Sequence, residues 1–132
     1  MKHLIPAMLW LCVTATSLEA QATKGSLIIV GGGSTPSAIP ERFIELAGGK
    51  DKARILVIPL ASANAEASGR SSTEVYTRLG VQARPLVLTR AQADHDTIAN
   101  TLKGITGVWF PGGVQSRITA ALRGTRFHRA LL

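Results

Sequence analysis

Residues 107–124 read GVWFPGGVQSRITAALRG, a complete strand–turn–helix pattern. The apolar run over residues 107–110 predicts a strand, and the glycine pair at 112–113 predicts a sharp turn after it. Apolar residues then recur at helical spacing over residues 115–123, which predicts a helix. A strand that leads through a tight turn into a helix is the unit from which parallel α/β sheets are built.

The preceding sequence repeats this unit. Apolar runs rich in β-branched residues predict three more buried strands, over residues 26–30 (SLIIV), 54–59 (RILVIP) and 84–88 (RPLVL). Segments with helical spacing separate them, so the predicted order is β-α-β-α-β-α-β-α within one domain, residues 23–132. This alternation predicts an α/β fold with an open, mostly parallel sheet and helices on both faces.

Capping residues predict where two of the helices begin. Ser71 and Glu74 are three residues apart, as in a capping box, and place the start of the second helix near Ser71. Asp94 or Asp96 would cap the third helix.

Three loops rich in Gly, Ser, Ala and Pro follow predicted strands, at residues 31–37 (GGGSTPS), 59–69 (PLASANAEASG) and 111–116 (PGGVQS). The carboxyl ends of parallel strands meet at one edge of a sheet, and ligands bind there in α/β folds. We therefore expect the three loops to lie side by side and to form the functional site.

Residues 1–22 are typical of a secretory signal peptide, since Lys2 precedes an apolar stretch that ends in Ala20-Gln21-Ala22. The apolar stretch is too short to span a bilayer. We expect cleavage after Ala22, giving a secreted or periplasmic protein with no membrane association. An uncleaved anchor, or a lipoprotein signal that uses Cys12, is the alternative. Cys12 is the only cysteine, so the mature chain would have no disulfide and no thiolate metal ligand.

The chain is basic, with a formal net charge of +7. A basic balance can indicate a nucleic-acid partner. The basic residues are scattered, however, and become dense only at Arg123, Arg126 and Arg129. This distribution is typical of a solvated surface, and we expect no nucleic-acid partner.

The candidate cofactor-binding and metal-binding motifs lack residues at the spacing that such sites require. The glycines at 31–33 lack the third glycine of a dinucleotide-binding fingerprint and the acidic residue after the next strand. The GGK at 48–50 is not a phosphate loop, because Asp51 stands at the Ser/Thr position. His95 and His128 have no partner at ligand spacing. We expect neither a cofactor nor a metal.

The 111–116 loop carries the candidate site. Gly112 and Gly113 allow close backbone approach to a ligand, and their N–H groups beside a helix start suit a developing oxyanion. Gln115 offers both a donor and an acceptor. Taken alone, the same residues are also compatible with an ordinary strand–helix turn.

The whole pattern resembles the cyanophycinase family, exopeptidases related to dipeptidase E. The resemblance covers nearly all of the sequence after residue 22 in the same order, and the strand-Gly-Gly-x-Gln-helix segment is its most specific part. The segments that carry it are SLIIVGGG (26–33), ERFIELAGGKDKARILVIPLASA (41–63), YTRLG (76–80) and GVWFPGGVQSRITAALRGT (107–125).

The resemblance implies a flavodoxin-like or class I glutamine-amidotransferase-like fold and a serine-type hydrolase with its nucleophile on a strand-to-helix elbow. It implies that Gly112 and Gly113 form the oxyanion hole and that Gln115 lines the substrate pocket. The substrate would be a peptide, and in the family it is the polymer cyanophycin, from which β-aspartyl-arginine dipeptides are released.

Two departures from the family pattern limit this expectation. Val114 stands where cyanophycinases usually have Asp. The family's Gly-Thr-Ser-Ala-Gly elbow follows a helix that here ends near Gly124, and residues 23–132 contain no serine in such a context. We expect a truncated, N-terminal portion of the enzyme that is inactive alone and whose unpaired sheet edge favours homo-oligomers. The alternative is a non-catalytic α/β module that binds a small ligand or peptide.

Overall fold

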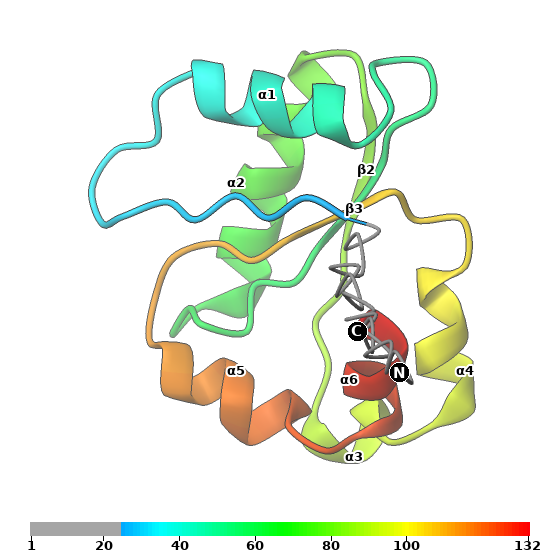
Figure 1. Ribbon diagram of the computed structural model, residues 1–132. Coiled ribbons are helices and arrows are strands. Elements are labelled where there is room, and N and C mark those ends of the chain that lie inside the picture. Colours follow the sequence, from blue (N-terminus) through cyan, green and yellow to red (C-terminus); the bar gives the residue numbers. More distant parts are fainter. Residues whose placement is uncertain (1–24) are drawn as a thin grey trace, which may run out of the picture.

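The computed structural model describes residues 25–132, so the predicted signal peptide lies outside the described residues. Figure 1 shows a small sheet with helices packed around it. Its elements are α1 (Ala38–Leu46), β1 (Arg54–Val57), α2 (Ala65–Arg78), β2 (Gln82–Pro85), α3 (Arg90–Ala93), α4 (Asp96–Ala99), the short 3₁₀ helix η1 (Asn100–Leu102), β3 (Gly107–Trp109), α5 (Gln115–Leu122) and α6 (Arg126–Leu131).

The sheet has three parallel strands in the order β2-β1-β3, and β1 lies in the centre. Ile55 of β1 is in register with Ala83 on one side and with Gly107 on the other. Helices connect the strands, as parallel neighbours require. Successive residues of β1 point to opposite faces and are buried on both, which explains why this strand is apolar throughout its length after Arg54.

The first face of the sheet packs against α1 and α2. Ile55 and Val57 enter this core, which includes an aromatic cluster of Phe43, Tyr76 and Trp109. The ring centroids of Phe43 lie 5.8 Å from Tyr76 and 5.4 Å from Trp109, spacings at which tilted and edge-on rings attract each other. The cluster joins α1, α2 and β3 across the central strand.

The second face packs against α3, α5 and α6 (Figure 1). Leu56 enters this core together with Leu122 and the fully buried Phe127. Helix α6 was not expected from the sequence pattern. Its start is fixed by Thr125, whose hydroxyl accepts a hydrogen bond from the N–H of His128 at 3.2 Å. Helices therefore cover both faces of an open parallel sheet, and the predicted α/β class is confirmed.

The prediction of a buried first strand at residues 26–30 is wrong. The segment is not hydrogen-bonded into the sheet, and the side chains of Leu27 and Ile29 are 83% and 85% exposed. A strand needs a neighbour to satisfy its backbone, and within residues 25–132 β3 pairs only with β1. Apolar composition indicated a strand, but the composition does not supply its partner.

Two predicted helix starts are also wrong. Helix α2 begins at Ala65, six residues before Ser71, because the side chain of Asn64 accepts a hydrogen bond from the N–H of Ala67 at 3.1 Å. Ser71 lies inside the helix and its hydroxyl donates to the carbonyl oxygen of Ala67. Ser71 and Glu74 resembled a capping box only in spacing.

The third predicted helix is divided into α3, α4 and η1, and neither aspartate caps it. Thr89 caps α3 through a capping box with Gln92, and His95 precedes α4. The predicted strand over residues 84–88 is shifted to Gln82–Pro85. Leu86 and Leu88, beyond Pro85, instead pack in the second core.

Candidate functional site

The turn between β3 and α5 lies against the loop that follows β1. Gly113 has a φ of 147°, in a region that favours glycine, and a Cβ added there would overlap the carbonyl oxygen of Ala61. Gly112, by contrast, has open space around it. The second glycine of the pair is therefore required by the close approach of two loops.

Hydrogen bonds to one carbonyl oxygen hold these loops together. The N–H of Val114 donates to the oxygen of Ala61 at 2.9 Å, and Nη1 of Arg117 lies 3.5 Å from the same oxygen. Ala61 is 2% exposed, so this contact is shielded from water. The Ala61 carbonyl thus fixes the position of the turn relative to the central strand.

The amide groups of Gly112 and Gly113 remain available. Both residues are exposed, and their N–H groups form no hydrogen bond with any other described residue. The turn leads directly into the eight-residue helix α5, whose amino end carries partial positive charge. Gln115 is the first residue of α5 and is exposed, with its amide unbonded among the described residues. The arrangement can donate hydrogen bonds to a negatively charged oxygen.

A cavity of about 860 Å³ opens beside this turn. It lies between the segment 25–33 and strand β3, and its lining includes Gly31 to Gly33 together with Gly112 and Gly113. The structure therefore brings all three glycine- and serine-rich loops to one end of the sheet, because the 59–69 loop meets the turn through Ala61. Gln115 does not line this cavity.

The described residues provide no nucleophile and base at this turn. No serine hydroxyl in residues 25–132 is hydrogen-bonded to a histidine ring. His95 lies at the start of α4, and Nδ1 of His128 accepts a hydrogen bond from the N–H of Gly124 at 3.3 Å. Within the same residues there is no group of three or more potential metal ligands. No helix in that part of the chain is both long and apolar enough to cross a bilayer.

The perturbed titratable groups lie away from the turn and have structural causes. Burial raises the pKa of the Tyr76 hydroxyl well above its ordinary value. The hydrogen bond and charge of Arg126, at 2.7 Å from Asp96, hold the pKa of that exposed carboxyl below its usual range. The candidate site is therefore defined by backbone geometry and not by side-chain titration.

Comparison with known proteins finds relatives by sequence. An open parallel α/β sheet with a glycine turn leading to a helix start defines a broad class, and no protein-family model matches the chain. Curated cyanophycinases from Synechococcus elongatus and from Thermosynechococcus vestitus (strain NIES-2133 / IAM M-273 / BP-1) are each 31% identical to it over 118 residues. These matches cover 86% of this chain and 36% of each relative, so the chain spans about a third of their length. The resemblance to cyanophycinases is confirmed.

Sequence reasoning missed one residue of this site, Ala61. Its carbonyl oxygen positions the turn, although its side chain is only a methyl group. The sequence signal that could have indicated Ala61 is its small size at the exit of a buried strand, two positions after Pro59. Ser62 follows, and its N–H donates to the carbonyl oxygen of Pro59. Small residues at such an exit permit another loop to approach closely.

Proposed function

We propose that this chain forms the oxyanion-binding part of a serine-type exopeptidase whose nucleophile comes from sequence outside residues 25–132. The observation that carries the proposal is the Gly112–Gly113 turn. Its two N–H groups are exposed and unbonded among the described residues, they lie beside the start of α5, and the Ala61 carbonyl holds them in place.

The chemistry follows from this geometry. When a nucleophile attacks a peptide carbonyl, negative charge develops on the carbonyl oxygen, and fixed N–H donors stabilise that charge. The amides of Gly112 and Gly113 would donate to this oxygen. Gln115, one residue beyond the turn on α5, would bind the polar groups of the substrate.

We propose a peptide substrate. The similarity to cyanophycinases supports this class and makes β-aspartyl-arginine peptides the first to be assayed. Val114 offers no polar group beside the turn, so the preferred peptide would differ from that of the relatives in the residue held there. We also propose that the protein acts outside the cytoplasm after removal of residues 1–22. Amino-terminal sequencing of the secreted protein tests this, and the expected first residue is Thr23.

The experiment uses a chimera in which residues 25–132 replace the matching third of the Synechococcus elongatus relative. We expect it to hydrolyse β-aspartyl-arginine peptides, whereas the 132-residue chain alone hydrolyses none. In the chimera, Gly112→Pro removes one N–H donor and should lower kcat by about 10²–10³-fold, as loss of an oxyanion donor does elsewhere. Gly112→Ala keeps the N–H and is the matched control.

Two results would contradict the proposal. One is equal activity of the Pro and Ala variants in a folded chimera. The other is hydrolysis by the 132-residue chain itself. Binding of the peptide by that chain, with no turnover in the chimera, would support a non-catalytic binding module instead.

A further inference from the structure

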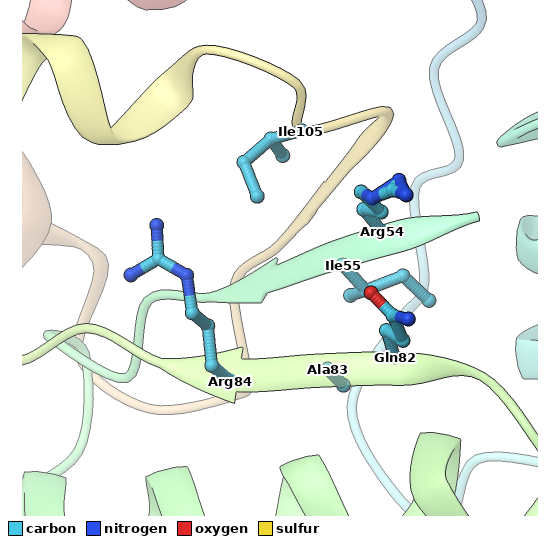
Figure 2. A pocket seen from close by; sticks show the side chains of 6 residues that line it. All are labelled: Arg54, Ile55, Gln82, Ala83, Arg84 and Ile105. Atoms are coloured by element: carbon cyan, nitrogen blue, oxygen red, sulfur yellow. The ribbon is translucent and has the colours of Figure 1, made fainter. Parts of the chain in front are cut away.

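A second hollow lies at the opposite end of the sheet from the Gly112–Gly113 turn. It opens over the amino ends of β1 and β2 and has a volume of about 240 Å³ (Figure 2). Its lining consists of Arg54, Ile55, Gln82, Ala83, Arg84 and Ile105. Nothing in the proposed peptidase site accounts for it.

The strand register explains why polar side chains gather there. Arg54 pairs directly with Gln82, and Arg84 lies two residues further along β2, so all three side chains project from the same face of the sheet. Figure 2 shows Arg54 and Gln82 together at one end of the hollow and Arg84 further along β2. Ile55 and Ala83 turn their side chains into the first core, which leaves strand backbone as the floor.

These polar side chains lie on a face of the sheet that is otherwise apolar. The same face is apolar at Leu56 and Ile58, where the helices of the second core cover it. At the amino ends of β1 and β2, the described helices do not cover this face. The guanidinium groups of Arg54 and Arg84 and the amide of Gln82 line it there. Ile105, from the segment before β3, borders the hollow on the far side (Figure 2).

Hydrogen bonds hold the side chain of Arg84 and the backbone of Arg54 in position. Nη2 of Arg84 donates to the carbonyl oxygen of Thr101 at 2.9 Å, which orients its guanidinium group. The backbone of Arg54 is held twice by Thr106, through the hydroxyl at 2.9 Å and through the N–H at 3.0 Å. The Arg84 guanidinium group, which is already oriented, therefore loses less conformational freedom on ligand binding than an unbonded side chain would.

The charge in the hollow is uncompensated by the described residues. The ion pairs among residues 25–132 are Arg42–Glu45 and Arg126–Asp96, and neither reaches this hollow. Among residues 25–132, no acidic residue lines it. Guanidinium groups bind carboxylate and phosphate oxygens through paired N–H donors, and Gln82 adds an amide donor. The volume lies below the 300–1,000 Å³ typical of sites for drug-sized ligands, so the ligand is small.

We propose that Arg54, Gln82 and Arg84 form a binding site for the oxyanion group of a small ligand, a phosphate or a carboxylate. The site is independent of the proposed peptidase function. It differs from a diffuse basic surface because its affinity depends on these particular side chains and not on net charge.

The test is isothermal titration calorimetry of the 132-residue chain with inorganic phosphate and, separately, with succinate, at constant ionic strength. We expect saturable binding of at least one of them. Arg54→Gln should weaken that binding about tenfold or more. Arg84→Lys keeps the positive charge but loses the planar guanidinium group with its paired N–H donors, so it should weaken anion binding several-fold. Arg70→Gln, an exposed arginine of α2 outside the hollow, removes the same charge and should leave the affinity within twofold.

Saturable binding of phosphate alone or of succinate alone identifies the preferred group. The absence of saturable binding for both anions would overturn the proposal, and so would an equal loss of affinity in Arg70→Gln and Arg54→Gln. Circular dichroism verifies that each variant is folded. Arg84→Lys serves as the deciding variant if Arg54→Gln does not fold, because a lysine can still donate to the Thr101 carbonyl.

Discussion

The Cα of Gly113 rests against the carbonyl oxygen of Ala61, so closely that any Cβ at position 113 would overlap it. The same oxygen accepts a hydrogen bond from Val114, and together these contacts lock the β3–α5 turn onto the exit of the central strand. The geometry of the candidate oxyanion site therefore depends on a backbone contact 52 residues away in the sequence.

The first prediction separates the two glycines of this turn. Gly113→Ala should lower the free energy of unfolding by about 1–3 kcal/mol, because it combines a strained φ with the overlap on Ala61. Gly112→Ala should change it by less than about 0.5 kcal/mol, because the space around Gly112 is open. Urea unfolding measures both, and equal losses would show that the contact with Ala61 does not constrain the turn.

The second prediction concerns the core contribution of α6. Phe127 is fully buried in the second core, so Phe127→Ala should destabilise the chain by about 3–5 kcal/mol. Leu132→Ala at the same end of the chain is the control, since Leu132 is 93% exposed. Leu132→Ala should change the free energy of unfolding by no more than about 0.5 kcal/mol. A small effect of Phe127→Ala in denaturant unfolding would mean that α6 is not part of the cooperative core.

The third prediction is a loss of stability at high pH. Burial raises the pKa of Tyr76 in the folded state above its unfolded value of about 10, so the folded state retains a proton that the unfolded state releases. The stabilisation is fully present below about pH 10 and is lost as the pH rises above it. Melting temperatures between pH 8 and 11 should fall more steeply for the wild type than for Tyr76→Phe, and parallel curves would refute this assignment.

The fourth prediction concerns the exposed pair Asp96–Arg126. The pKa of Asp96 is lowered by its hydrogen bond to Arg126, so the pair stabilises the fold above about pH 4 and this contribution is lost as the pH falls further. Asp96→Asn should lower the melting temperature slightly at pH 7, and the difference should vanish near pH 2 and in 1 M salt. A difference that persists at pH 2 would have another cause.

The fifth prediction is self-association through the segment 26–30. Leu27 and Ile29 expose apolar side chains near the edge of β3, which pairs with no second strand among residues 25–132, and such surfaces promote association. The double variant Leu27→Lys/Ile29→Lys should reduce the oligomeric fraction in light scattering coupled to gel filtration. Leu132→Lys, at an equally exposed apolar residue, should not. A wild-type protein that is monomeric at all concentrations would contradict the prediction.

The sequence predicted the parts of the fold in which the local residue pattern and the tertiary contacts favour the same structure. Residues 55–57 are apolar on both faces, and the structure buries both faces in a central parallel strand. The turn at Gly112 and Gly113 was predicted for the same reason, because paired glycines have few roles between a strand and a helix. Their catalytic role, and that of Gln115, stays a prediction.

The remaining features depend on partners that no local pattern reveals. The apolar run 26–30 has the composition of a strand but no hydrogen-bonding neighbour among residues 25–132. Asn64 rather than Ser71 starts α2, because the choice between two capping residues depends on where the preceding loop ends. The role of Ala61 depends on its backbone carbonyl, which almost every residue type has, and its small side chain indicates only that another loop could approach.

The central place of β1 also has a consequence for synthesis on the ribosome. Ile55 leaves the ribosome well before Ala83 and Gly107, its partners on either side, have been translated. Until both arrive, the apolar strand with the most buried side chains has no neighbour to pair with. We therefore expect β1 to join the sheet only after residue 107 has left the ribosome, and a chaperone that covers residues 54–58 until then would protect this strand from wrong pairing.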